Sequence, residues 1–500
     1  MHTTPIRPKL ALIALAFAWL LPLVAAAPLP AADADLPKPI RQVEGVSEYA
    51  LDNGLRVLLV PDPSQATVTV NITYLVGSMH EGYGETGAAH LLEHMVFKGT
   101  PTHPNVASAL NDHGAQWNGS TWLDRTNYFE TMPASDENVE FGVCFEADRM
   151  VKSRVSAEDL ASEMTVVRNE WESGENSPRG VLFKRMQAVA YDWHGYGHST
   201  IGARSDLEGI PIERLQAFYR TYYQPDNAIL VVAGKFDRDK ALRAIVRCFG
   251  AVPRPERELP PMYTSEPAQD GERAVTLRRV GEIAAVGAAY HSPPAVHADA
   301  AVLAVIAELL GAEPTGRLYE ALVETDKATG VYAFTFDNRH PSLVWFFAEL
   351  RKEQDIDEVR RVLREEVEGL AATEVTPEEL ETAKSSLLKG LRQLLNNSQW
   401  FAVSLSEWAS MGDWRLFFIH RDRLEAVTAK DVVRVAGRYL VPTNATIGTY
   451  VPTDEPTRVE VASVSDEELA RIVGSYEAAA ELADAGEEFE ATPANIHRHT

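Results

Sequence analysis

Apolar and polar positions in the first part of the chain predict a sheet followed by a helix. Residues 49–60 form two strand-like runs on either side of Asn53-Gly54, a dipeptide typical of tight turns between antiparallel strands. Residues 68–76 alternate between apolar and polar side chains, the period of two that a half-buried strand requires. We expect a helix that contains residues 90–94 to follow this strand.

A second helix is predicted over Val155–Trp171, with Ser156 as its N-cap. Glu163 and Glu170 lie two helical turns apart in it (170 − 163). Both carboxylates are therefore expected on the same face of this helix, far along the sequence from residues 90–94.

Two segments of the chain resemble each other at a constant offset. Each is expected to be a helix end that feeds a turn and then a closing strand. Two homologous domains explain the constant offset, whereas convergence on a common helix-turn-strand pattern is the alternative. The matching residues are Tyr222 and Tyr439, Pro225 and Pro442, Asn227 and Asn444, and Ala228 and Ala445, each pair at an offset of 217 (439 − 222, 442 − 225, 444 − 227, 445 − 228).

Composition predicts five regions. Residues 1–26 are read as a signal peptide, residues 45–252 as a first, catalytic domain, and residues 253–272, which hold five prolines, as a linker. Residues 273–460 would form the second domain, in which no paired histidines recur, so that Ala298–Leu310 is expected to be core. Residues 461–500 form an acidic tail, expected to be a solvated helix followed by a flexible end.

The leader and the charge predict an exported protein. Arg7 and Lys9 precede an apolar run that ends in small residues, which is typical of a secretory leader, so the protein is expected in the periplasm of a Gram-negative host without stable membrane insertion. An uncleaved signal anchor is the alternative. The formal charge of −25 argues against binding to nucleic acid. Cys144 and Cys248 pair in an oxidising compartment or remain free buried thiols.

The segment His90-Leu-Leu-Glu93-His94 holds the candidate chemistry. In a helix, positions 90, 93 and 94 fall within a narrow arc, so both imidazoles can reach one metal ion while Glu93 faces the same space. Neutral imidazoles are preferred ligands of zinc, and a catalytic zinc keeps one position open for water. Glu93 would then act as the general base on that zinc-bound water, in an inverted form of the His-Glu-x-x-His motif.

Residues 82–100, which include this motif, resemble the active-site helix of the pitrilysin and insulinase family of zinc metallopeptidases, including the mitochondrial processing peptidase β subunit. In that family a distal glutamate completes the metal site, and Glu170 matches it at the family's spacing from His94. Glu163 matches a family carboxylate that supports the metal ligands without binding the metal itself. The resemblance implies one Zn²⁺ per chain, bound by His90, His94 and Glu170. By contrast, His194-Gly-Tyr-Gly-His198 is expected to be a loop, because its glycines oppose helix formation.

The resemblance also implies how a peptide substrate would bind. Residues 118–128 resemble the sheet-edge segment along which family substrates add as an extra strand. The residues expected to bind substrate there are Asn118, Gly119, Ser120 and Thr121, and Gly119 stands where relatives commonly have alanine. An ordinary edge strand is the alternative.

A second substrate contact is expected from the other half of the chain. In active relatives an arginine and a tyrosine there hold the substrate. Tyr332 matches the tyrosine, but Thr325 stands where the arginine is sought.

These observations predict an α+β fold. It would have two homologous domains, each a mostly antiparallel sheet covered by helices, and the two would form half of a clamshell. The predicted function is that of a zinc-dependent endopeptidase acting on peptides or unfolded segments. Half a shell needs a second half, so we expect a homodimer or a heterodimer with a homologous subunit. The alternative is a non-catalytic or partner-dependent scaffold subunit.

Overall fold

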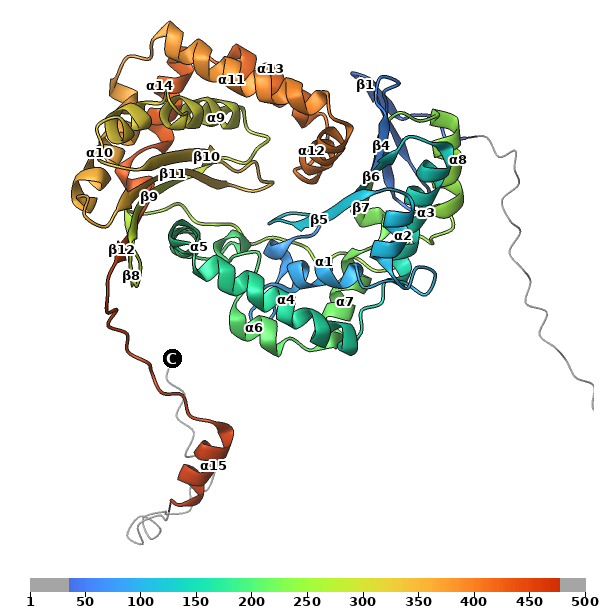
Figure 1. Ribbon diagram of the computed structural model, residues 1–500, viewed down its shortest axis with the longest axis horizontal. Coiled ribbons are helices and arrows are strands. Elements are labelled where there is room, and N and C mark those ends of the chain that lie inside the picture. Colours follow the sequence, from blue (N-terminus) through green and yellow to red (C-terminus); the bar gives the residue numbers. More distant parts are fainter. Residues whose placement is uncertain (1–35, 477–500) are drawn as a thin grey trace, which may run out of the picture.

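The computed structural model describes residues 36–476, which form two sheets with helices around them (Figure 1). The first sheet has the strand order β1-β2-β3-β7-β4-β6-β5, and all neighbours are antiparallel except β3 and β7. Its strands are β1 (Arg41–Val43), β2 (Val46–Ala50), β3 (Arg56–Pro61), β4 (Thr67–Tyr74), β5 (Gln116–Thr121), β6 (Thr126–Pro133) and β7 (Ala228–Gly234).

The second sheet has five strands in the order β10-β11-β9-β12-β8. Only β12 and β8 are parallel neighbours. Its strands are β8 (Arg273–Arg279), β9 (Ile283–Ser292), β10 (Gly330–Thr335), β11 (Ser342–Arg351) and β12 (Ala445–Pro452). The predicted α+β class with two mostly antiparallel sheets is confirmed.

Fifteen α-helices accompany these strands in the described part of the chain. Those that precede the second sheet are α1 (Ala88–Val96), α2 (Val106–Asp112), α3 (Asp136–Lys152), α4 (Ala157–Glu175), α5 (Pro178–Ala190), α6 (Arg204–Gly209), α7 (Ile212–Tyr222) and α8 (Arg238–Cys248). The others are α9 (Ala298–Gly311), α10 (Ile356–Gly369), α11 (Pro377–Leu395), α12 (Ser398–Ser410), α13 (Leu416–Ala426), α14 (Ala429–Tyr439) and α15 (Asp466–Gly474). None of these helices is long and apolar enough to cross a membrane.

The internal repeat seen in the sequence recurs in the strand pairing. Arg56 of β3 lies opposite Ile229 of β7, and Arg273 of β8 lies opposite Thr446 of β12, so both partners shift by the same offset of 217 (273 − 56, 446 − 229). Two helix pairs repeat at an offset of 220: α4 and α11 (377 − 157), and α5 and α12 (398 − 178). The two halves of the chain therefore share one topology.

Each sheet is covered by a helix from the other half of the chain. Helix α12 packs against β4 and β7 of the first sheet, and α5 packs against β8, β9 and β12 of the second. Met186 of α5 approaches the second sheet so closely that a Cβ at Gly448 would lie 2.3 Å from its sulfur, and one at Gly287 would lie 2.6 Å away. These two glycines let α5 lie close to the second sheet, because a side chain at either position would require Met186 to move. Helices α5 and α12 thereby connect the two halves.

Several local predictions are confirmed. Asn53-Gly54 forms the turn between β2 and β3, where Gly54 has a φ of +99°, a conformation that favours glycine. The Ser156 hydroxyl accepts a hydrogen bond from the backbone N–H of Asp159 at the start of α4. The apolar segment predicted to be core forms α9, in which 10 of 14 residues are buried. Local capping and turn chemistry were therefore predictable from the sequence.

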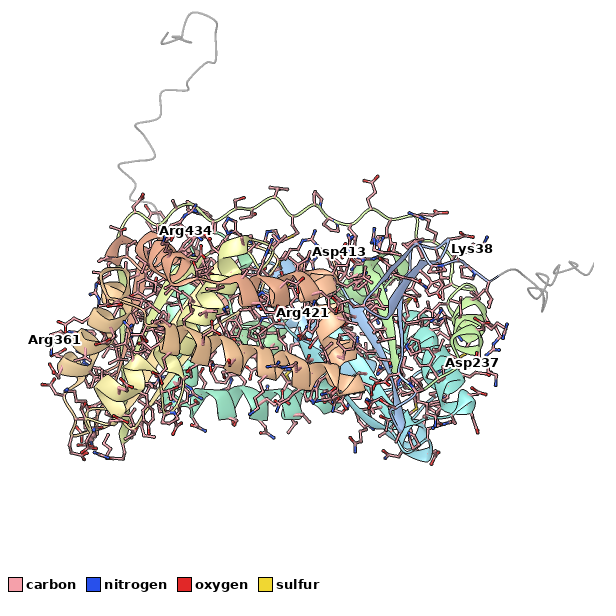
Figure 2. All side chains as sticks on the ribbon, turned by 90° about the horizontal axis from the view of Figure 1, so that it is seen from above. Lys38, Asp237, Arg361, Asp413, Arg421 and Arg434 are labelled. Carbon is pink, nitrogen blue, oxygen red and sulfur yellow. A yellow bond between two sulfur atoms is a disulfide. The ribbon has the colours of Figure 1, made fainter. Side chains whose placement is uncertain are left out.

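The alternatives for the two cysteines are resolved in favour of a disulfide. Cys144 of α3 and Cys248 of α8 are bonded, with their Cα atoms 5.2 Å apart. The bond joins two helices that pack side by side at one end of the molecule. In Figure 2 this end is marked by Asp237, the N-cap of α8, and the opposite end by Arg361 of α10. It closes a covalent loop between residues 104 positions apart.

The domain boundaries drawn from the sequence stay predictions. Residues 253–272 contain no helix or strand, and Glu266 within them accepts hydrogen bonds from the backbone N–H groups of residues 192–194. The predicted leader at residues 1–26 lies outside the described residues. Of the acidic tail, residues 461–476 are described, and they include the solvent-exposed helix α15.

Candidate metal centre

Helix α1 presents its two histidines on one side and packs its apolar side into the core. Leu91, Leu92 and Met95 are fully buried, while His90 and His94 are half-buried. The Glu81 carboxylate accepts hydrogen bonds from the backbone N–H groups of residues 87 and 89 at 2.8 and 2.7 Å. This interaction satisfies donors that the first turn of a helix leaves free, and it fixes where α1 begins.

Helices α1 and α4 pack together and bring the three predicted ligands within reach of one ion. The Nε2 atoms of His90 and His94 lie 3.3 Å apart, and the Glu170 Oε2 atom lies 3.6 Å from the first and 3.5 Å from the second. Ligands bound tetrahedrally at about 2.0–2.1 Å from zinc are separated by about 3.3–3.4 Å. This triangle of two nitrogens and one oxygen fits a zinc ion with its fourth position free.

Glu163 lies behind His94 rather than beside the ligand atoms. Its Oε1 atom is 3.0 Å from Nδ1 of His94, and its other oxygen forms an ion pair with Lys98. Burial raises the pKa of Glu163, but hydrogen bonds from Lys98 and His94 outweigh that effect and leave the pKa lowered. The ionised carboxylate fixes the ring of His94 with Nε2 directed toward the other ligands, which is how outer partners commonly orient a metal-binding imidazole.

His90 is held neutral by its surroundings. Burial, reinforced by the neighbouring His94, lowers its pKa to about 4. A neutral imidazole can donate a lone pair to a metal, so the ring is ready to bind one at neutral pH. Its Nδ1 atom is buried and has no hydrogen-bond partner among the described residues, so His90 lacks the support that Glu163 provides to His94.

Glu93 is buried and faces the edge strand β5. The hydroxyl of Thr121 donates a hydrogen bond of 2.6 Å to Oε2 of Glu93. Burial raises the pKa of Glu93, and this hydrogen bond opposes the rise. A Cβ atom at Gly119 would lie 3.1 Å from Oε1 of Glu93, so the glycine leaves space beside the carboxylate. This geometry suits a general base, whose pKa is best placed near the working pH.

Strand β5 lies at the edge of the first sheet, where residues 118–121 were predicted to lie. It pairs with β6 on one side, and within residues 36–476 no strand pairs with its other side. Asn118 is exposed and Gly119 is buried against Glu93. An extended peptide could therefore pair with the free side of β5 next to the metal ligands.

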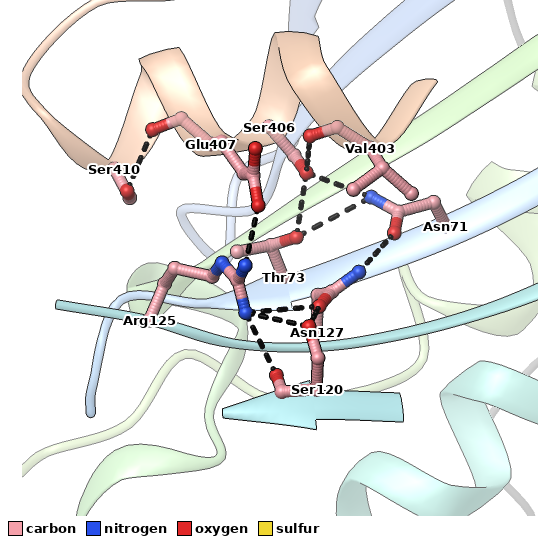
Figure 3. A network of polar contacts seen from close by, with 9 residues as sticks. All are labelled: Asn71, Thr73, Ser120, Arg125, Asn127, Val403, Ser406, Glu407 and Ser410. Atoms are coloured by element: carbon pink, nitrogen blue, oxygen red, sulfur yellow. Dashed lines mark hydrogen bonds and ion pairs between the residues drawn. The ribbon is translucent and has the colours of Figure 1, made fainter. Parts of the chain in front are cut away.

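A polar network connects β5 to the second half of the chain (Figure 3). Arg125 donates hydrogen bonds to the carbonyl and the hydroxyl of Ser120 at 2.9 and 2.7 Å, and it forms an ion pair with Glu407 of α12. The hydroxyl of Ser406, also on α12, is 2.9 Å from Nδ2 of Asn71 and 2.8 Å from the Thr73 hydroxyl, both on β4. Helix α12 therefore contacts both a central strand of the sheet and the hairpin that carries the edge.

Tyr332 lies on β10, the edge strand of the second sheet, and 37% of its surface is exposed. Thr325 is exposed and its hydroxyl donates to the carbonyl of Ala321, so it does not replace an arginine. A cation is nevertheless present: the guanidinium carbon of Arg179, at the start of α5, lies 4.0 Å from the ring centroid of Tyr332.

The histidines at 194 and 198 do not join the metal ligands. The segment was predicted to be a loop, but Gly195–Gly197 form one turn of 3-10 helix, at whose start His194 accepts a hydrogen bond from the backbone N–H of Tyr196. Among residues 36–476, only His90, His94 and Glu170 form a cluster of three or more potential metal ligands.

Sequence reasoning missed four residues around the site. Lys98 follows His94 by four positions, two residues beyond the last residue of α1, and could have been found from this spacing. The three others, Arg125, Arg179 and Glu407, gave no local signal, because the ion pair of Arg125 with Glu407 and the contact of Arg179 with Tyr332 each join the two halves of the chain.

Comparison with known proteins agrees with this geometry. Residues 56–204 match the model of the family described as insulinase, peptidase family M16, and residues 209–387 match that of the peptidase M16 inactive domain. Zinc protease PqqE of Helicobacter pylori is 27% identical over 404 residues, which are 79% of this chain and 90% of that protein. The β subunit of the mitochondrial processing peptidase of Blastocladiella emersonii is 24% identical over 424 residues, 82% of this chain and 89% of that subunit.

Solved structures share the fold. The crystal structure of a protease from Helicobacter pylori has a TM-score of 0.78 and 26% identity, and the match covers 83% of this chain and all of that one. The periplasmic protease PqqL from Escherichia coli has a TM-score of 0.68 and 18% identity, and the match covers 83% of this chain but 48% of PqqL, which shows the fold alone. With two family models matched over most of residues 56–387, this chain belongs to peptidase family M16, the insulinase family.

Proposed function

We propose that this chain is a zinc-dependent endopeptidase that hydrolyses peptides or unfolded protein segments. The observation that carries the proposal is the triangle of His90, His94 and Glu170, with the buried carboxylate of Glu93 on the same helical turn as the histidines. The relatives named as zinc proteases support the same interpretation. A scaffold has no chemical need for four converging polar groups.

Different residues of the chain have different roles in the proposed hydrolysis. A zinc ion held by the three ligands would supply a Lewis acid and lower the pKa of water. Glu93 takes a proton from the attacking water and later delivers it to the leaving amine. Thr121 orients the carboxylate of Glu93 by its hydrogen bond, and Glu163 orients His94.

The substrate in this proposal is an extended peptide that pairs with the free side of β5. Backbone groups of residues 118–121 would hold it beside Glu93, so recognition depends mainly on the main chain rather than on one side chain. Tyr332 of β10 would contact a more distant part of the same peptide, with Arg179 beside it.

The proposed setting is a dimer in an oxidising compartment. The mitochondrial relative is by its name a subunit, and a chain with two such domains gives half of a closed chamber. The leader predicted at residues 1–26 and the disulfide between Cys144 and Cys248 both favour export, with the periplasm as the proposed location.

The decisive experiment substitutes Glu93→Gln and measures two quantities on the full chain. Bound zinc is measured by elemental analysis, and cleavage is measured on a mixed peptide library. The matched control is Glu172→Gln, the same chemical change at an exposed position of α4, two residues from Glu170. A third variant, His94→Ala, removes a ligand.

We expect Glu93→Gln to retain zinc and lose cleavage by at least a thousandfold, with Glu172→Gln unchanged and His94→Ala losing both zinc and cleavage. Zinc binding without cleavage by the unsubstituted chain, alone or with a homologous subunit, would contradict an endopeptidase and leave a scaffold subunit.

A further inference from the structure

The two sheets differ at one edge, although their repeat is otherwise close. In the first sheet, β3 pairs with β7 on one side and with β2 on the other. In the second sheet, β8 pairs with β12 at the equivalent register, and its other side pairs with no strand of residues 36–476. The equivalent of β2 is therefore missing from the second sheet.

The sequence explains why β8 is left open. Adding 217 to the bounds of β2 (46 and 50) gives residues 263–267, which form no strand and include Pro267. Proline has no N–H to donate to a neighbouring strand. Glu266 in this segment is instead bound to the backbone of residues 192–194. These hydrogen bonds hold the linker against residues 192–194. The backbone groups on the outer side of β8 therefore remain available to pair with another strand.

The surface beside β8 is positively charged in a protein of net charge −25. A groove there is lined by residues 275–279 of β8, by Arg185, Ala188 and Val189 of α5, and by Arg458. Arg185 and Arg278 are exposed, and no ion pair in the described part of the chain engages either of them or Arg458. The positively charged β8 edges of two copies would repel each other, whereas an acidic strand would be attracted to this edge.

The chain itself contains an acidic segment with the pattern of a strand. We call residues 453–476 the C-terminal arm. It begins at β8, because the backbone N–H of Thr453 donates to the carbonyl of Arg279 at 2.8 Å. Its segment Val459-Glu-Val461 places one acid between two valines. In the first sheet, Glu48 of β2 lies opposite Leu58 of β3 and forms an ion pair of 2.9 Å with Arg56 of the same strand, so an acid on the neighbouring strand can pair with an arginine of β3.

The arm leaves its own body after Arg458. In Figure 1 it runs away from the second sheet toward α15, and 86% of Val459 and 89% of Val461 are exposed. Helix α15 has an acidic first turn and an apolar side that no other described residue covers, consisting of Leu469, Ile472 and Val473, each at least half exposed. Such a surface is expected to be buried in an assembly.

We propose that the arm of one copy adds as a strand to the free side of β8 in a second copy. Val459–Val464 would take the place that β2 has in the first sheet, with its acid beside Arg278. Val280, directly after β8, and Ile283, the first residue of β9, are exposed apolar side chains, and the proposed pairing assigns them to contacts with the valines of the added strand. The exchange is reciprocal in a symmetric pair, so each copy both donates an arm and accepts one.

This inference rests on the proposed pairing of two chains but not on peptide hydrolysis. Its first test compares the full chain with a variant that ends at Arg458, by size-exclusion chromatography with multi-angle light scattering. We expect a dimer for the full chain and at least a tenfold increase in the dimer dissociation constant after truncation. A dimer that is unaffected by truncation overturns the arm exchange while leaving the proposed pairing intact, and a monomeric full chain overturns both.

Charge reversal tests the accepting surface without shortening the chain. The double variant R185E/R278E should weaken the dimer about tenfold, because it places acids opposite an acidic arm. Lys389→Glu is the matched control, since Lys389 is exposed on α11 and makes no ion pair within the described residues. Equal effects of the reversal and the control would overturn the assignment of the β8 groove.

Crosslinking distinguishes a second copy from the chain's own arm. Single variants Thr276→Cys and Val461→Cys are mixed and treated with a short bismaleimide, which spares the native disulfide. We expect a covalent pair containing one of each variant, and none when Lys389→Cys replaces Thr276→Cys. The double variant T276C/V461C carries both cysteines in one chain. If crosslinks form only within this chain, and it stays a monomer, the arm binds its own β8 and the arm exchange is overturned.

Discussion

Arg125 forms an ion pair with Glu407, although the two residues are 282 positions apart in the chain. Arg125 precedes β6, and its guanidinium also binds the carbonyl and hydroxyl of Ser120 on β5. Glu407 lies on α12, which the second half of the chain contributes to the first sheet. The second half therefore helps to set the position of the strand that faces the metal centre.

Removing the charge of Glu407 should impair substrate binding more than chemistry. In Glu407→Gln, Arg125 loses its ionic partner and holds β5 less firmly, so we expect kcat/KM to fall about tenfold, mostly through KM. Steady-state kinetics on a peptide substrate measures the split. The reversal R125E/E407R should recover part of the loss, whereas Glu425→Gln, at an exposed position of α13, should have no effect. A loss confined to kcat would contradict this positioning role.

Substitution of Glu163 should weaken metal binding. Glu163→Gln removes the negative charge that orients His94, and loss of such an outer partner typically costs about 10- to 100-fold in metal affinity. Competition with a chromogenic zinc chelator measures this change without any assay of activity. Glu158→Gln, exposed on the same helix, is the control. Equal zinc affinity in both variants would show that Glu163 does not support the ligand.

The hydrogen bond from Thr121 should be visible in the pH profile. It stabilises the charged form of Glu93 and so lowers the pKa of that carboxyl, against the larger effect of burial. In Thr121→Val this bond is lost, the pKa of Glu93 rises, and the acidic limb of kcat/KM against pH moves to higher pH. Thr121→Ser keeps a hydroxyl and should keep the limb in place. A limb that does not move in the valine variant would contradict the assignment of Glu93 as base.

Buried histidines should make the fold sensitive to acid. Burial lowers the pKa of His420 from 6.5 to about 4, so between these values the unfolded chain binds a proton that the folded chain does not. Stability therefore falls as the pH falls from about 6.5 to 4, by on the order of 3 kcal/mol for this residue. Urea unfolding at pH 7 and pH 4 measures the difference. His420→Gln should reduce it, and an unchanged difference would assign the sensitivity to other groups.

Loss of the disulfide should destabilise the first half of the chain. Replacing both Cys144 and Cys248 by alanine opens a loop that joins residues 104 positions apart, and such a loss typically costs about 2–4 kcal/mol. Urea unfolding of the variant and of the native chain, both without reductant, gives the value. Reductant should destabilise the native chain and leave the variant unchanged. Equal stability of the two proteins would show that the bond adds nothing.

Much of the metal centre was predictable because it depends on short spacings and on local helix geometry. His90, Glu93 and His94 share one helical turn, and Glu163 and Glu170 share one face of α4. The helix start at Ser156 and the turn at Asn53-Gly54 also follow from local chemistry. The ligand triangle needs only that these two helices pack together, which the family resemblance implied.

Relationships between distant segments were set by tertiary packing. The exchange of α5 and α12 between the two sheets, the pairing of Arg125 with Glu407, and the position of Arg179 over Tyr332 depend on elements far apart in the chain. The constant offset between the repeated segments indicated two similar halves, but it did not show which half covers which sheet. Sequence alone was enough to predict that His90, His94 and Glu170 form one cluster and to predict several strands, because these depend on local periodicity. The tertiary structure decided which surfaces pack together and which edge of β8 stays open. These features depend on contacts between residues hundreds of positions apart, and such contacts form only when the whole chain folds.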